Sequence, residues 1–290
     1  MRIVSLLPSA TEIVYALGLG DQLHGVTHQC DFPENALTKP ILVKPFIITN
    51  GLTSLEIDQV VSARLASGQP IYHVDQEGLI QANPDLILTQ KICDVCAVSF
   101  DQVQKLEGIV NNNTKVLSLD VHSFDDMLSN IIEVGTVAGV ENVANLLVVS
   151  MKKRLALMKK TVSELDYKPR VICIEWLDPL MVGGHWIPEL VHLAGGVDCI
   201  GERGQPSKTI TWDEFQQARP DFVLVMPCGF DTKQGKDHLA DLMYRRGWDS
   251  LPGVDMNKVC VLDGNSYFSR SGPRLLDGLE IIFNIIHPDL

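Results

Sequence analysis

Apolar and polar positions in the first half of the chain alternate between short apolar runs and longer stretches with helical spacing. The apolar runs predict buried strands at residues 2–7, 23–27, 86–89 and 116–119. A helix is predicted from Pro8 to Leu17, with Ser9 as its N-cap and Glu12 completing a capping box. A further helix is predicted at residues 54–67.

The second half of the chain shows the same alternation. Strands are predicted at residues 170–176, 222–226 and 259–262, and helices at 188–194, 212–218 and 273–286. Strands that alternate with helices are typical of parallel sheets covered by helices.

One helix-turn-strand pattern occurs twice. The residues Ala82-Asn-Pro-Asp-Leu-Ile-Leu-Thr-Gln90 return as Ala218-Arg-Pro-Asp-Phe-Val-Leu-Val-Met226. The copies lie too far apart for a solenoid repeat, so they favour two similarly built lobes with a cleft between them. A chance match is the alternative, because helix-Pro-Asp-strand is a common local solution in α/β proteins.

A proline-free stretch between the two halves predicts a helical connection. From Ser123 to Leu165 the apolar residues follow helical spacing, with a break expected near Gly139. A helix of about 20 residues spans about 30 Å, the width of a domain. The predicted fold is therefore α/β, with two Rossmann-like lobes that contain parallel sheets, one long helix joining them and a ligand cleft between them. The predicted boundaries are 1–122 for the first lobe, 123–166 for the helical bridge and 167–290 for the second lobe.

Composition restricts the class of partner. The 290 residues are 46% hydrophobic and carry a formal net charge of -12, which argues against nucleic acid as a partner. The start of the chain shows no signal peptide, and no run of about 18 apolar residues predicts a membrane span. Seven cysteines, an odd number, do not form a secreted disulfide framework. We therefore expect a cytoplasmic protein with no insertion into membranes.

Candidate ligand contacts come from the loops that follow the predicted strands, because ligands of α/β sheets bind beyond the carboxyl ends of the strands. These loops carry imidazole, indole, phenol, amide and charged groups. The candidates are Ser9, Thr11, His28 and Gln90 in the first lobe and Glu175, Trp176, His185, Trp186, Asn265, Tyr267, Phe268 and Arg270 in the second.

The loop cysteines suggest a second kind of site. Cys93 and Cys96 have the spacing of half a zinc site, and Cys30 and Cys228 lie on other candidate loops. Thiolate and imidazole ligands suit zinc or iron. Unligated thiols in polar loops are the alternative. The chain contains no Walker loop, GxGxxG, GxSxG or HExxH motif, so the common nucleotide-binding and hydrolase chemistries lack support.

Several motifs resemble one branch of the periplasmic substrate-binding proteins, the branch that binds cobalamin and iron-siderophores. They are Arg2-Ile-Val-Ser-Leu-Leu-Pro-Ser-Ala-Thr-Glu12, Ala16-Leu-Gly-Leu-Gly20, Cys30-Asp-Phe-Pro33, Asn83-Pro-Asp-Leu-Ile87, Leu193-Ala-Gly-Gly196 and Tyr267-Phe-Ser-Arg-Ser-Gly-Pro-Arg274. More narrowly, the chain resembles a subgroup of this branch that is cytoplasmic and lacks a signal peptide. The motifs that carry this resemblance are Cys93-Asp-Val-Cys-Ala-Val-Ser99, Glu175-Trp-Leu-Asp-Pro179, Gly184-His-Trp-Ile-Pro-Glu189 and Met226-Pro-Cys-Gly-Phe230.

The resemblance implies a binding protein, rather than an enzyme, that captures a corrinoid such as cobalamin, or a related metal chelate, between the lobes. Tyr267 stands where the transport proteins place a large aromatic residue against the ligand. Glu77 is available as the docking glutamate of the first lobe, but Ser269 stands where the second is expected. This departure and the lack of a signal peptide argue against docking to a permease.

Two functions therefore remain open from the sequence. The first is corrinoid binding, with Trp176, Trp186, Tyr267 and Phe268 covering the macrocycle and His28 or His185 at the metal. The second is a zinc or iron metalloprotein or metalloenzyme that uses the four loop cysteines, with Glu175 as acid or base. The oligomeric state is open, with a homodimer among the options.

Overall fold

The structure is a computed structural model in which the chain divides into two compact units. Unit 1 comprises residues 1–51, 59–121 and 125–150, and unit 2 comprises 52–58, 122–124 and 151–290. The structure describes residues 1–92, 95, 97–98, 102–103, 110, 113–251, 254 and 258–290.

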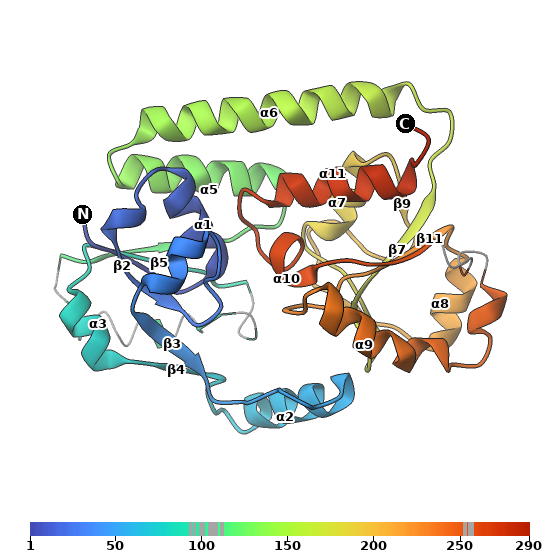
Figure 1. Cartoon of the computed structure of the whole chain (residues 1–290), viewed down its shortest axis with the longest axis horizontal. Coiled ribbons are helices and arrows are strands. Elements are labelled where there is room, and N and C mark those ends of the chain that lie inside the picture. Colours follow the sequence, from blue (N-terminus) through green and yellow to red (C-terminus); the bar gives the residue numbers. More distant parts are fainter. Residues whose placement is uncertain are drawn as a thin grey trace. The chain divides into compact units, whose positions relative to one another are not determined.

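Unit 1 is built on a six-stranded sheet. Its strands are β1 (Ile3–Ser5), β2 (Leu23–Thr27), β3 (Ile41–Pro45), β4 (Tyr72–Val74), β5 (Leu86–Thr89) and β6 (Lys115–Ser118). They lie in the order β4-β3-β2-β1-β5-β6 (Figure 1). All pairs are parallel except β3 with β4, so the predicted parallel sheet has an antiparallel edge.

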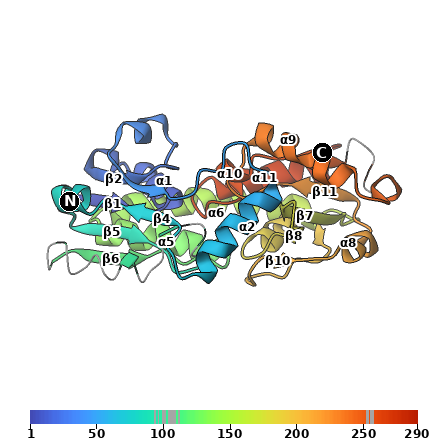
Figure 2. The ribbon, with the colours of Figure 1, turned by 90° about the horizontal axis from the view of Figure 1, so that it is seen from below.

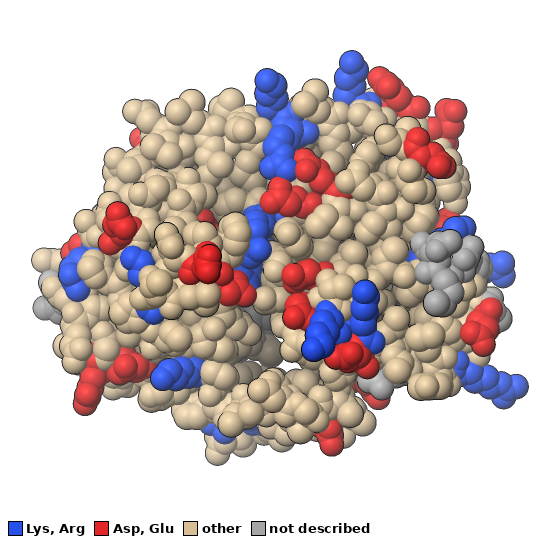
Figure 3. All heavy atoms as spheres, viewed as in Figure 1, with Lys and Arg blue, Asp and Glu red and all other residues tan. Residues whose placement is uncertain are grey.

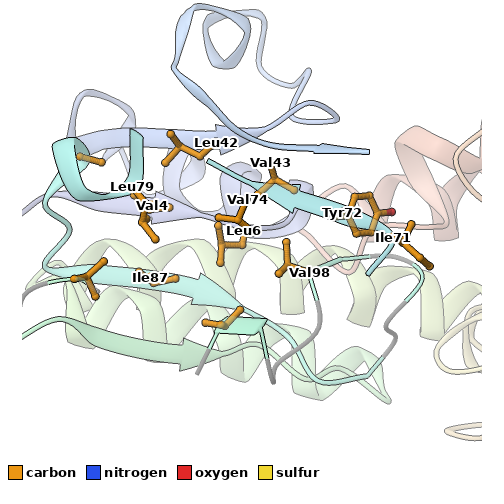
Figure 4. Close-up of a cluster of buried hydrophobic side chains, with 13 residues drawn as sticks. Val4, Leu6, Leu42, Val43, Ile71, Tyr72, Val74, Leu79, Ile87 and Val98 are labelled. Carbon is orange, nitrogen blue, oxygen red and sulfur yellow. The ribbon is translucent and has the colours of Figure 1, made fainter. Parts of the chain in front are cut away.

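The core of unit 1 is formed by apolar side chains from several of its strands. Side chains from neighbouring strands, such as Val4, Leu42, Val74 and Ile87, form one buried cluster, to which Leu79 of helix α3 (Gln76–Ala82) also belongs (Figure 4). A strand covered on both faces can bury every side chain, as β5 does along its whole length.

Unit 2 contains a second sheet. Its strands are β7 (Arg170–Trp176), β8 (Met181–Val182), β9 (Val197–Asp198), β10 (Lys208–Thr209), β11 (Phe222–Val225) and β12 (Val259–Val261). Along the order β10-β8-β7-β11-β12, β7, β11 and β12 are parallel, while β8 is antiparallel to both β7 and β10 (Figure 2). β9 pairs with β7 in parallel. Both sheets are therefore mixed: the predicted parallel strands form their centres, and short antiparallel strands are added at their edges.

Helices accompany both sheets. They are α1 (Pro8–Ala16), α2 (Ser54–Ala66), α3, α5 (Phe124–Val137) and α6 (Glu141–Ser163), followed in unit 2 by α7 (Ile187–Leu193), α8 (Trp212–Ala218), α9 (Thr232–Met243), α10 (Gly264–Tyr267) and α11 (Leu275–Ile286). The capping box predicted for the first helix was wrong: the N-cap of α1 is Leu7, which makes no side-chain cap, and Ser9 and Glu12 lie inside the helix.

The repeated sequence pattern forms the same structure twice. α3 and α8 end at Ala82 and Ala218, and the next residues, Asn83 and Arg219, are left-handed with φ of 42° and 43°. The strands β5 and β11 follow two residues after the prolines. This match confirms two similarly built α/β lobes.

The two copies also share one network of hydrogen bonds. In unit 1 the backbone N–H of Arg2 donates to Asp85 Oδ2 at 2.7 Å, and the guanidinium donates to the carbonyl of Ala82 at 2.6 Å. In unit 2 the backbone N–H of Arg170 donates to Asp221 Oδ2 at 2.8 Å, and its guanidinium donates to the carbonyl of Ala218 at 2.7 Å. The arginine before each first strand thus ties that strand to the end of the repeated helix.

The helical connection is broken where a glycine allows it. Gly139 adopts φ of 74° between α5 and α6, a backbone conformation that other residues rarely adopt. α6 has 23 residues, about 34 Å of helix, and continues from unit 1 into unit 2 as the helix that links the lobes. It is not the only connection, because residues 52–58 and 122–124 also belong to unit 2. In the part of the chain that the structure describes, no helix is long and apolar enough to cross a membrane.

Candidate functional site

The predicted ligand contacts lie at the carboxyl ends of the strands of their own units. In unit 1 they follow β1, β2 and β5, and in unit 2 they follow β7, β8 and β12. The carboxyl ends of the parallel strands form the edge at which open α/β sheets bind ligands. His185 and Trp186 follow β8, which runs antiparallel to β7, so the carboxyl end of β8 points to the opposite edge. A cleft that joins the two sets stays a prediction.

Unit 1 has a small cavity at this edge. It measures about 10 Å³, comparable to the space of one water molecule. Its walls are formed by Leu6, Pro8, Thr27, His28, Gln29, Val43, Tyr72, Ala97 and Val98. Leu6, Val43, Tyr72 and Val98 also belong to the core cluster, so the cavity floor is rigid (Figure 4).

His28 is held in a defined orientation at this cavity. Its Nδ1 lies 3.2 Å from the carbonyl oxygen of Val43, and its ring centroid lies 6.0 Å from that of Tyr72. Because a carbonyl only accepts, this hydrogen bond places the proton of the neutral ring on Nδ1 and the lone pair on Nε2. Burial lowers the pKa of His28, which favours this neutral form near pH 7.

Ser9 and Thr11 lie in the first turn of α1 and make buried contacts instead of forming an open surface. Both are buried, and the Thr11 hydroxyl lies 2.9 Å from Ser5 Oγ and 3.0 Å from Cys30 Sγ. Gln90 is also buried, with a relative exposure of 9%. Of the four ligand contacts predicted in unit 1, His28 therefore has the most accessible position.

In unit 2 a buried carboxyl group anchors the edge of the sheet. Glu175 at the end of β7 accepts a hydrogen bond of 2.6 Å from the Ser207 hydroxyl, and that hydroxyl accepts from the backbone N–H of Gly184 at 3.2 Å. Burial raises the pKa of Glu175, although the hydrogen bonds from Ser207 and Gly184 act in the opposite direction. Ser207 was not predicted as a site residue, and no sequence motif marks it.

Glu175→Gln is expected to remove a pH-dependent loss of stability. The folded protein keeps the Glu175 proton to a higher pH than the unfolded chain does. The free energy of unfolding of the native protein should therefore fall as pH rises from about 4.5 through the raised pKa. Urea unfolding between pH 5 and 8 should show a flatter profile for Glu175→Gln, and Glu202→Gln, whose side chain is exposed, is the control. An unchanged profile in Glu175→Gln would show that Glu175 does not hold this proton.

His185 occupies a strained backbone position next to this carboxyl group. Its φ is 50°, fixed by hydrogen bonds of its N–H to the Gln205 carbonyl and of its carbonyl to the Gly204 N–H. Its Nδ1 is buried and has no hydrogen-bond partner among the described residues. Burial, and then the charge of nearby His122, lower the pKa of His185. Strain of this kind is concentrated at functional sites.

The predicted indoles are engaged inside unit 2. Trp176 Nε1 donates to the carbonyls of Ser54 and Asp178, and its ring lies 5.3 Å from that of Phe230. Trp186 is buried and donates to the Phe268 carbonyl at 2.9 Å. Phe268 is only 3% exposed. Trp186 and Phe268 therefore pack within the lobe, and Trp176, which is half-buried, keeps more surface.

The loop around α10 holds the remaining predicted contacts. Arg270 is buried and donates to Asn265 Oδ1 at 3.0 Å. Tyr267 is half-buried, and the guanidinium of Arg274 lies 5.6 Å from the centre of its ring. Tyr267 is thus the aromatic side chain in this loop that retains surface for a ligand.

Two of the four cysteines predicted to bind a metal, Cys30 and Cys228, lie among the described residues. Cys30 is buried beside Thr11 and Thr27 in unit 1, and Cys228 is half-buried in unit 2, both as free thiols. Cys93 and Cys96 lie outside the described residues. Within the described ranges no group of three or more His, Cys, Asp or Glu side chains could hold a metal ion. The four-cysteine site stays a prediction, which metal analysis of the purified protein would test.

The sequence did not identify Tyr72, Val43 and Ser54. Tyr72 and Val43 complete the walls around His28, and Ser54 accepts from Trp176 and contacts His238 Nδ1 at 3.2 Å. β3 and β4 were not predicted as strands, so their residues could not be placed at the edge of the sheet.

The comparisons with known proteins agree with this architecture. The periplasmic binding protein family model matches residues 3–265. Among curated proteins, the uncharacterized ABC transporter substrate-binding lipoprotein YvrC of Bacillus subtilis is 28% identical and covers 99% of this chain and 80% of its own.

Two solved structures share the fold. The periplasmic vitamin B12 binding protein BtuF of Vibrio cholerae has a TM-score of 0.73 and 20% identity and covers 99% of this chain and 96% of its own. The periplasmic heme-binding protein RhuT of Roseiflexus sp. RS-1 has a TM-score of 0.73 and 20% identity, with coverage of 99% and 98%. The chain belongs to the periplasmic binding protein family and is a substrate-binding protein of that class.

Proposed function

We propose that the protein binds a metal-centred macrocycle, and a corrinoid in the first place, with the Nε2 atom of His28 as a ligand to the metal. The observation that carries the proposal is the hydrogen bond of His28 Nδ1 to the Val43 carbonyl at the carboxyl edge of the sheet. Metal-binding histidines commonly donate their other ring N–H to a carbonyl, which fixes the ring and its tautomer. His28 has this arrangement, with its Nδ1 at the Val43 carbonyl and its Nε2 available to a metal.

The ligand class is supported by the names of similar proteins. Relatives of this chain include proteins named for vitamin B12 binding and for heme binding. Corrinoid and heme share a flat macrocycle with a central metal that accepts axial nitrogen ligands. Of the apolar side chains that line the cavity beside His28, Pro8 is half-buried and keeps surface that suits contact with such a macrocycle.

Equilibrium dialysis against a panel of ligands tests this proposal. The panel is aquacobinamide, cyanocobalamin, hemin and iron-free protoporphyrin. Aquacobinamide and hemin have exchangeable axial positions, so we expect them to be retained more strongly than cyanocobalamin and protoporphyrin. Equal retention of hemin and protoporphyrin would contradict a role for the metal, and retention of none of the four would overturn the proposal.

His28→Gln is expected to weaken aquacobinamide binding at least about tenfold, which corresponds to 1.4 kcal/mol. Glutamine keeps polarity and approximate size but offers no imidazole nitrogen to the metal. His73→Gln is the matched control, because His73 lies on the same sheet in β4, is exposed and does not line the cavity. The dissociation constants of the three proteins should be compared by dialysis at pH 7.

Acidification is expected to weaken the same binding. A proton on Nε2 competes with the metal, so affinity should be full above the lowered pKa of His28 and decrease as pH falls through it. The measurement is the aquacobinamide dissociation constant between pH 4.5 and 8 in the native protein. A decrease of the same size in His28→Gln would assign the effect to another group.

We also propose two aspects of the biological role. The name of the Bacillus subtilis relative supports an association with an ABC transporter. A cytoplasmic location is supported by Cys173, Cys199, Cys228 and Cys260, which form no disulfide in the described part of the chain, because reduced thiols suit a reducing compartment. Fractionation of cells that express the native gene tests the location.

A further inference from the structure

Unit 2 contains a large open pocket away from the residues discussed above. Its volume is about 610 Å³, within the range of small-molecule sites. It is formed by the end of α6, the loop that follows α6, helix α7 and the loop after β9. The lining residues are Lys159, Val162, Ser163, Leu165, Lys168, Glu189, His192, Leu193 and Arg203.

The charge of this pocket is opposite to that of the whole chain. The protein carries a net charge of -12, yet the pocket lining has three cationic side chains, from Lys159, Lys168 and Arg203, and one carboxylate. That carboxylate, Glu189, already accepts a hydrogen bond of 2.7 Å from the backbone N–H of Phe124. Basic side chains also occur along α6 beside acidic ones over α11, where Arg154 pairs with Asp277 and Glu280 (Figure 3). In contrast, no ion pair of Lys159, Lys168 or Arg203 is found within the described ranges.

His192 shows that these cations converge. It lies on α7 in the pocket wall, and its pKa is lowered first by partial burial and then by the positive charges of Arg203, Lys168 and Lys159. Positive charges from α6, from the loop that follows α6 and from the loop after β9 therefore all affect the imidazole of His192. All three cationic side chains are exposed, so water screens their mutual repulsion, and an anion bound in the pocket is attracted by each of them.

We propose that this pocket binds a phosphate-bearing small molecule. The fork of Arg203 matches two phosphate oxygens, and Lys159 and Lys168 supply point charges for the remaining ones. The pocket is much larger than a phosphate group, and Val162, Leu165 and Leu193 form an apolar wall against which an organic part of the ligand packs. The ligand is thus a phosphate ester of about nucleotide size. No residue of this pocket lies among the proposed macrocycle contacts, so the two sites are separate.

Isothermal titration with AMP, inorganic phosphate and adenosine tests the site. AMP should bind saturably, inorganic phosphate more weakly because it leaves the apolar wall uncovered, and adenosine not at all. The double variant Arg203→Gln/Lys168→Gln should lose at least tenfold in AMP affinity. Lys160→Gln is the control, because Lys160 neighbours Lys159 on α6 but does not line the pocket. Absence of AMP binding, or equal binding by the double variant, would overturn the proposal.

Two further measurements distinguish alternative sources of the phosphate and alternative sites. By NMR, AMP should raise the pKa of His192, since an added anion favours the imidazolium, and should leave the lowered pKa of His24 in unit 1 unchanged. In sedimentation with vesicles that contain phosphatidic acid, the protein should stay in solution. Cosedimentation with the vesicles without AMP binding would identify a lipid headgroup as the ligand and would overturn the proposal. The double variant should bind aquacobinamide as the native protein does. Loss of AMP binding and loss of aquacobinamide binding can therefore be measured independently.

Discussion

Gly184→Ala is expected to lower the free energy of unfolding of unit 2 by about 3 kcal/mol, the upper range for an overpacked position. A Cβ at this position would lie against backbone atoms of Gln205, Pro206 and Ser207 at distances that real Cβ atoms do not show. Backbone cannot move aside as the end of a flexible side chain can. The displaced segment also carries Ser207, so the hydrogen bond to Glu175 should be lost as well.

Tryptophan fluorescence during urea unfolding is the measurement for this prediction. All four tryptophans, Trp176, Trp186, Trp212 and Trp248, belong to unit 2, so the signal follows that unit. Gly204→Ala is the control. Gly204 lies in the same region with φ of 70°, but a Cβ there meets only the His122 carbonyl oxygen at 3.9 Å, an ordinary van der Waals contact, so only backbone strain of about 1 kcal/mol is expected. Equal midpoints for the two variants would contradict the close approach at Gly184.

Asp221→Ala is expected to destabilise the protein by about 2 kcal/mol and Asp85→Ala by about 1 kcal/mol. Asp221 Oδ2 accepts two hydrogen bonds, from the Arg170 N–H and from the Tyr167 hydroxyl at 2.5 Å. Asp85 Oδ2 accepts one, from the Arg2 N–H. Hydrogen bonds to charged groups contribute about 1.5–3 kcal/mol, and the exposure of both sites reduces this to the lower values given.

The two aspartates can be assigned to their units by the choice of probe. Asp221→Ala should shift the unfolding midpoint seen by tryptophan fluorescence, whereas Asp85→Ala should shift far-UV circular dichroism, which reports both units. Tyr167→Phe isolates the second hydrogen bond of Asp221 and should account for about half of its effect. An equal decrease in the free energy of unfolding in Asp85→Ala and Asp221→Ala would contradict the explanation by the number of hydrogen bonds that each aspartate accepts.

Local patterns in the sequence were sufficient for the central elements of the fold. The Pro-Asp repeat identified the two lobes because proline and a left-handed residue end each helix at the same place, and β5 and α8 were predicted with their observed bounds. The edge strands were missed because β8, β9 and β10 have only two residues each, too few for a periodic pattern. The antiparallel pairing of β8 and β10 and the parallel pairing of β9 with β7 depend on tertiary contacts.

The candidate site was predicted less completely than the fold. Trp186, Phe268 and Thr11 were predicted as ligand contacts only because they follow strands in the sequence. All three are buried, and this burial depends on tertiary packing that a sequence pattern does not reveal. His28 was identified as a candidate, whereas its orientation depends on Val43, which lies on the unpredicted strand β3. Pairing of distant segments therefore decides which loop residues face a ligand.

The proposed binding of a metal-centred macrocycle is tested most directly by the absorbance spectrum of aquacobinamide titrated with the protein at pH 7. Replacement of an axial water by an imidazole nitrogen changes the visible bands of the corrinoid. We expect a saturable spectral shift that is complete at one equivalent of native protein and absent with His28→Gln. An unchanged spectrum with folded native protein, or the same shift with His28→Gln, would contradict the assignment of His28 as the metal ligand.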